Sequence, residues 1–106
     1  MDKATILASL GKRTVVRDVT GVGPVRIREL SAPDVARIRD ATGDKKEDFG
    51  FRLVLESVVG DDDTPVFTDA DLDDLRAAAQ SRIGALITAV LDINGFSADE
   101  QAAKNE

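Results

Sequence analysis

The sequence predicts an α+β fold in which a small β-hairpin packs against about four helices. Two β-branched runs, residues 14–19 and 25–30, flank a turn rich in glycine and proline, which is typical of a hairpin. After Ser31, apolar residues recur with helical spacing as far as Ile93. A chain of 106 residues with 42% hydrophobic content forms one domain with a modest core. We expect this α+β domain to span residues 1–96.

The hairpin carries the first candidate binding residues. In its second strand, Val25 and Ile27 alternate with Arg26 and Arg28, so the two pairs face opposite sides. A two-stranded hairpin is marginal alone, and it needs helices on its apolar face or another copy along its edge. Arg26 and Arg28 could bind an anionic partner, or they could simply face solvent.

Two helices are predicted around the hairpin. Asp2 caps a short helix within residues 1–12, which Gly11 ends and which we expect to be mobile unless it docks. Ser31 and Asp34 form a capping box for the helix that follows the hairpin. Its inward positions are Val35, Ile38 and Ala41, and Gly43 ends it. Residues 44–48 read as a mobile charged connector.

Residues 49–59 predict one apolar helix. The residues at helical spacing are Phe51, Val54, Leu55, Val58 and Val59. A buried strand would also fit this composition, but a run of about 11 residues favours a helix.

An acidic segment follows, and it holds the remaining candidate binding residues. Thr68 and Asp71 form a capping box for a helix over residues 69–79, whose inward positions are Leu72, Leu75 and Ala79. Asp69, Asp73 and Asp74 are candidates for contacting a basic partner. We expect no metal site, because a calcium loop counted from Asp61 has Val66 and Leu72 where glycine and glutamate are required.

The last predicted helix starts at Gln80 or Ser81 and is the most periodic segment. Its apolar face contains Ile83, Leu86, Ile87, Val90 and Leu91. This face belongs to the core by default, although part of the apolar supply could remain for a partner. The run Asn94-Gly95-Phe96 ends the helix, with Gly95 in the left-handed conformation. Residues 97–106 are expected to form a flexible tail or linker.

Charge and composition narrow the function. Residues 1–55 carry a net charge of +3 and residues 56–106 carry −9. This asymmetry suggests weak head-to-tail self-association or a basic protein partner, although a solvated acidic face explains it equally well. An acidic chain is a poor nucleic-acid binder. The chain contains no cysteine and no histidine, and its remaining polar residues show no catalytic spacing, so we expect no enzyme activity and no cofactor. No apolar run is long enough to cross a membrane, and the N-terminus does not resemble a signal peptide, so we expect a cytoplasmic protein.

Several short motifs together resemble one family. They are "V-x-I-R-E-L-S", "F-x-F-x-L-V", "S-V-V" before an acidic turn, "P-V-F-T-D-A-D-L", "L-D-I-N-G-F-S" and a terminal "A-K-N". Their order and spacing over residues 14–105 resemble the tail assembly chaperones of long-tailed bacteriophages. The resemblance implies a non-enzymatic chaperone that coats the apolar, helical tape measure protein, with the tail tube protein as a further partner, in the host cytoplasm.

Two further hypotheses accompany this reading. Members of that family often have a longer product made by a programmed frameshift, and the residues Ala103, Lys104 and Asn105 can be encoded by a slippery run of adenines. From a different functional class, the chain could be a small acidic regulatory or antitoxin-like module that blocks a basic site on a protein target.

Overall fold

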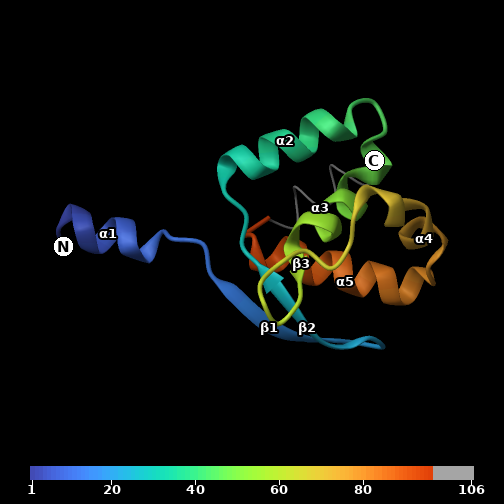
Figure 1. Ribbon diagram of the computed structural model, residues 1–106, viewed down its shortest axis with the longest axis horizontal. Helices are drawn as coiled ribbons and strands as arrows, with labels where there is room; N and C mark the ends of the chain where they lie inside the picture. Colours follow the sequence, from blue (N-terminus) through green and yellow to red (C-terminus); the bar gives the residue numbers. More distant parts are fainter. Residues whose placement is uncertain (97–106) are drawn as a thin grey trace.

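The computed structural model describes residues 1–96 as an α+β fold with a three-stranded antiparallel sheet and five α-helices (Figure 1). The elements are α1 (Lys3–Ser9), β1 (Thr14–Val19), β2 (Gly23–Arg28), α2 (Ala32–Thr42), η1 (Lys46–Asp48), α3 (Phe49–Ser57), β3 (Val58–Val59), η2 (Asp69–Asp71), α4 (Leu72–Ala77) and α5 (Gln80–Ile93). The predicted α+β class is confirmed. The expectations for a flexible tail and for a slippery run concern residues 97–106, outside the described residues.

The sheet has the order β1-β2-β3. The hairpin register pairs Val15 with Ile27 and Arg17 with Val25. The second strand starts at Gly23 and ends at Arg28, two residues earlier at each end than predicted. Gly23 has a φ of 111°, a conformation open mainly to glycine, so it allows pairing to begin directly after the turn.

The third strand corrects the sequence prediction. Val58 and Val59 do not extend the preceding helix; they form β3, which pairs antiparallel with β2. Both side chains are buried. They are buried in the core as a strand because β2 has an unpaired edge beside them. The helical spacing of residues 49–59 gives no information about this distant partner.

The core lies between the sheet and four helices, with α3 at its centre in contact with α2, α4 and α5 (Figure 1). Its fully buried side chains include Ile27, Leu53, Val54 and Val90. The apolar face predicted for the last helix is core: Ile83, Leu86, Val90 and Leu91 are buried and Ile87 packs against them. The apolar face of α5 therefore packs inside the domain.

Two predicted inward positions are wrong. Ala41 is exposed, and Thr42 occupies the buried position at the end of α2, where its hydroxyl donates to the carbonyl of Ile38 (2.7 Å). Ala79 is also exposed, because α4 ends at Ala77 and the chain turns into α5.

The expected helix ends are present. Ser31 and Asp34 make the predicted capping box at α2, and Thr68 and Asp71 make the second one at η2. At the end of α5, Gly95 has a φ of 77° and the Phe96 N–H donates to the Leu91 carbonyl (3.0 Å). That bond and the edge-on contact of Phe96 with Phe49 fix the end of the described chain against the core.

Candidate protein-interaction surface

Exposed apolar side chains gather at the N-terminal end of the chain. The large apolar residues that remain exposed in the described chain are Met1, Ile6, Leu7, Leu10, Val15, Val16, Val22 and Val66. Six of these eight lie within the first 16 residues. Their concentration in one stretch of the sequence makes the N-terminal end a candidate interaction surface.

Four of these eight exposed apolar residues belong to the N-terminal arm, residues 1–12, which contains α1. Figure 1 shows α1 standing away from the sheet and the other helices, and none of its residues is buried. Asp2 caps it by accepting from the Thr5 N–H (2.9 Å), as predicted. Ile6, Leu7 and Leu10 are 43%, 59% and 72% exposed. This spacing places the three on one side of the helix.

The root of the arm is fixed to the domain by polar contacts. The Lys12 ammonium lies 2.8 Å from Asp34 Oδ2 at the start of α2. The Arg13 N–H donates to the Glu29 carboxylate (2.9 Å), and the Glu29 N–H donates back to the Arg13 carbonyl (2.8 Å). These contacts hold the point at which the arm leaves the domain.

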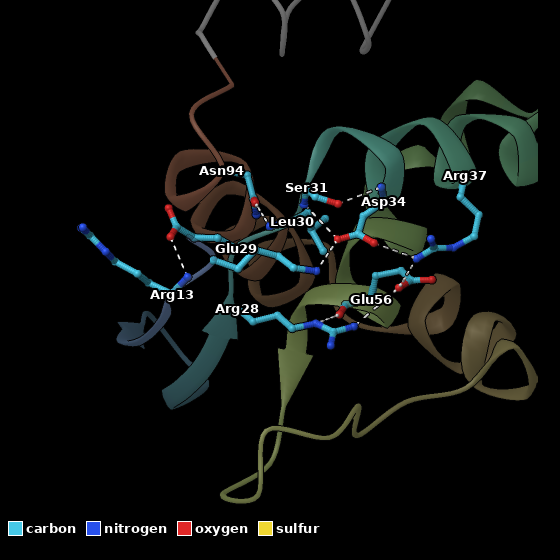
Figure 2. A network of polar contacts seen from close by, with 10 residues as sticks. Arg13, Arg28, Glu29, Leu30, Ser31, Asp34, Arg37, Glu56 and Asn94 are labelled. Carbon is cyan, nitrogen blue, oxygen red and sulfur yellow. Dashed lines mark hydrogen bonds and ion pairs between the residues drawn. The ribbon is translucent and has the colours of Figure 1, made fainter. Parts of the chain in front are cut away.

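Figure 2 shows the wider polar network around this root. Asp34 accepts from the Ser31 N–H (2.9 Å) and from Arg37 (3.2 Å) as well as from Lys12. The Lys12 contact and the Ser31 N–H together hold the pKa of Asp34 far below its ordinary value. Asn94, at the end of α5, accepts from the Leu30 N–H (2.7 Å). These contacts thus join the segment between β2 and α2 to the end of α5, close to the point where the arm leaves the domain.

Arg26 and Arg28, the predicted basic strip, already have acidic neighbours in the structure. Arg26 contacts Asp63 (2.7 Å) in the loop after β3. Arg28 donates to the Glu56 carbonyl (3.0 Å) and lies 3.7 Å from its carboxylate (Figure 2). Much of the positive charge expected to face a partner is therefore balanced within the chain.

The predicted acidic candidates lie on another part of the molecule, in η2 and α4. Asp69 is 3.8 Å from Arg52, and Asp73 accepts from Arg76 (2.7 Å). Asp74 has an exposed side chain. The structure places these aspartates on elements separate from Arg26 and Arg28, so the five residues do not make one site.

Sequence reasoning missed the charged residue Asp48. It lies at the end of the stretch predicted to be a mobile connector, yet it is buried and accepts two hydrogen bonds from Arg76. The hydrogen bonds from Arg76 lower its pKa. No local signal marks it, since its partner lies 28 residues away.

Within residues 1–96, no three carboxylates come close enough together to hold a metal ion. Nor does any helix in that part of the chain combine the length and apolar character needed to cross a membrane. Comparison of the chain with protein-family models, curated protein sequences and solved structures gave no match.

Proposed function

We propose that the chain is a non-enzymatic assembly chaperone that uses its N-terminal arm to bind and shield an apolar, helical protein. The observation that carries this proposal is the exposed apolar side of α1, formed by Ile6, Leu7 and Leu10 on an arm with no buried residue. Such a stripe packs well against the apolar stripe of another helix.

The length of α1 supports the same conclusion. Isolated helices shorter than about 12–15 residues are marginal in water, and α1 has seven. In the described structure it is reinforced by the Asp2 cap, by the Ser9 hydroxyl donating to the Ile6 carbonyl, and by the Arg13 guanidinium donating to the Ser9 carbonyl. A helix of this kind gains most of its stability from a surface that covers it, which a binding partner would supply.

The resemblance to phage tail assembly chaperones suggests which partner this is. On that reading, the arm binds the tape measure protein in the host cytoplasm before the tail tube polymerises, and many copies along one long partner raise the avidity. The tail tube protein would be a second partner.

The alternative, an acidic regulatory or antitoxin-like module, relies on Asp69, Asp73 and Asp74. Two of these three already lie beside Arg52 or Arg76, which reduces the charge they offer to a basic target. The apolar side chains of α1 are not buried against the rest of residues 1–96. The arm is therefore the better supported binding element.

Co-expression with the tape measure protein of the same genome tests the proposal. We expect several copies of the parent chain per tape measure protein, and loss of the complex in the Leu7→Asp, Leu10→Asp double variant. Val66→Asp is the matched control, because Val66 is 55% exposed and lies outside the arm. A complex that survives the double variant would refute the role of the arm, and a one-to-one complex with a compact basic protein would favour the alternative.

A further inference from the structure

We propose that two copies of the chain pair through the free edge of β1 to form a continuous six-stranded antiparallel sheet. β1 is one edge of the sheet and β3 is the other. This inference does not depend on the proposed function, since it uses the strand rather than the arm.

The β3 edge is already covered by the chain itself. Val59 forms a bridge with Pro65, and the Val66 N–H donates to the Val58 carbonyl (3.3 Å). The Gly60 N–H also donates to the Thr64 carbonyl (2.9 Å). The loop after β3 therefore blocks this edge, and β1 is left as the open edge of the described sheet.

The hydrogen-bond pattern shows which groups of β1 face outward. The Glu29 N–H donates to the Arg13 carbonyl (2.8 Å), so these two residues form a bonded pair of the hairpin. In an antiparallel ladder, bonded pairs alternate with pairs whose N–H and C=O groups point away from each other. Val15 and Arg17 thus bond to β2, and the backbone groups of Thr14, Val16 and Asp18 point away from it. No hydrogen bond within residues 1–96 reaches these three from outside the hairpin.

This edge has few of the devices that protect natural edge strands from pairing. Such strands are commonly blunted by charged side chains, lysine above all, by proline or by a bulge. The charged residues of β1 are Arg17 and Asp18, and Arg17 is held by Asp92 of α5 (2.9 Å). The sequence of β1 is TVVRDV, and its register with β2 runs without a bulge from Thr14 to Val19. Val15 and Val16 are 38% and 60% exposed, so pairing would also cover β-branched apolar surface.

Symmetry and charge select one register. A two-fold axis perpendicular to the sheet keeps each side chain on its own face. Directly opposed residues of antiparallel strands share a face, so one residue of β1 must lie opposite its own copy at the axis. Centring the pair on Val15 places Arg13 opposite Arg17. Centring it on Arg17 places that arginine opposite its own copy. Both registers are disfavoured, because like charges directly opposite each other are destabilising. Centring on Val16 places Val16 opposite Val16, Val15 opposite Arg17 and Thr14 opposite Asp18. No like charges then oppose each other along the strand.

This arrangement differs from head-to-tail association of the basic and acidic halves. Backbone hydrogen bonds and valine contacts resist salt, whereas exposed opposite charges are screened beyond about 8 Å at physiological ionic strength. Because the strands run antiparallel, the two N-terminal arms leave the dimer from opposite ends. Such a dimer would present two binding arms to one long partner.

Cysteine cross-linking tests the register directly, since the chain has no cysteine of its own. Directly opposed residues of a bonded pair have Cα atoms about 5.5 Å apart, within reach of a disulfide. We expect Val16→Cys to give a covalent dimer on mild oxidation, at twice the 11.3 kDa of one chain. Val66→Cys, at a similarly exposed position, is the control and should give no covalent dimer under the same oxidation. Equal cross-linking of the two variants would overturn the proposal.

Analytical ultracentrifugation tests the dimer itself. The parent chain should be dimeric at high micromolar concentration, and Val16→Pro should be monomeric with an unchanged circular dichroism spectrum, because proline is tolerated where a strand N–H faces solvent. Val16→Glu and Val16→Lys should each be monomeric alone and dimerise when mixed, since residue 16 opposes itself. A monomeric parent, including one whose edge pairs only with a different protein, or a dimer that persists in Val16→Glu, would refute the inference.

Discussion

Arg76 of α4 binds Asp48 through two donors and so ties α4 to the segment that precedes α3. Its Nε donates to Asp48 Oδ1 (3.0 Å) and its Nη2 donates to Oδ2. The same guanidinium also donates from Nη1 to Asp73 (2.7 Å). The two carboxylates differ in burial, since the Asp48 side chain is 4% exposed and that of Asp73 is 90% exposed.

This contrast predicts unequal effects of removing the two acids. Asp48→Ala should lower the free energy of unfolding by about 1.5–3 kcal/mol, the range for a hydrogen bond to a charged group. Asp73→Ala should change it by less than about 1 kcal/mol, as for an exposed ion pair. Urea denaturation of both variants gives the comparison. Equal losses would show that the burial of Asp48 has no energetic consequence.

Acid should destabilise the domain through Asp34 and Asp48. The pKa of each is lowered in the folded chain, for Asp34 mainly by Lys12 and for Asp48 mainly by Arg76. The folded state thus binds these protons more weakly than the unfolded state does. Their stabilisation is complete above the ordinary carboxyl pKa of about 4 and is lost as the pH falls through the lower folded values.

The urea midpoint should therefore stay level from pH 7 to about pH 5 and then fall steadily towards pH 2. Asp34→Asn should be less stable than the parent at neutral pH and should lose less on acidification, because one of the carboxyls with a lowered pKa is gone. A parent and variant whose midpoints fall in parallel would argue that the polar network around Asp34 does not contribute.

The sequence predicted those features whose partners are close along the chain. Both capping boxes join residues three apart, and the stop at Gly95 is read from adjacent residues. Local chemistry decides such features, so a pattern of a few residues is sufficient.

Features that depend on distant partners were not predictable. Val58 and Val59 become a strand because Ile27 and Arg26 lie beside them in β2. Asp48 is buried because Arg76 reaches it from α4. Periodicity treats each segment alone, and a run with apolar residues on a helical face can be taken into a sheet when an unpaired edge is available.

The candidate binding residues show the same limit. The sequence identifies the charges of Arg26 and Arg28, but not that Asp63 and Glu56 neutralise them from later segments. It does identify the short helix in the arm. The large apolar residues of α1 stay exposed because the other four helices form the core without α1, and only the structure shows this.

Leucine truncation should separate the core from the arm. Leu86 is 7% exposed in the core, and Leu7 is 59% exposed on α1. Leu86→Ala should cost about 2–5 kcal/mol of unfolding free energy and Leu86→Asp should unfold the domain, since an unpaired buried charge costs more than a cavity. Leu7→Ala should leave the urea midpoint unchanged within error. A large loss for Leu7→Ala would mean that α1 packs on the domain.

Two glycines should respond to alanine with opposite signs. Gly84 lies inside α5, and a Cβ there meets only the Gln80 side chain at an ordinary 3.7 Å. Gly84→Ala should therefore stabilise the domain by up to about 1 kcal/mol through helix propensity. Gly95 ends the same helix at a φ of 77°, where a Cβ costs about 1–2 kcal/mol. Gly95→Ala should be destabilised by about that amount even though a Cβ there meets no atom within 4 Å. Urea unfolding of the two single variants checks both signs, and two changes of the same sign would contradict the assigned end of α5.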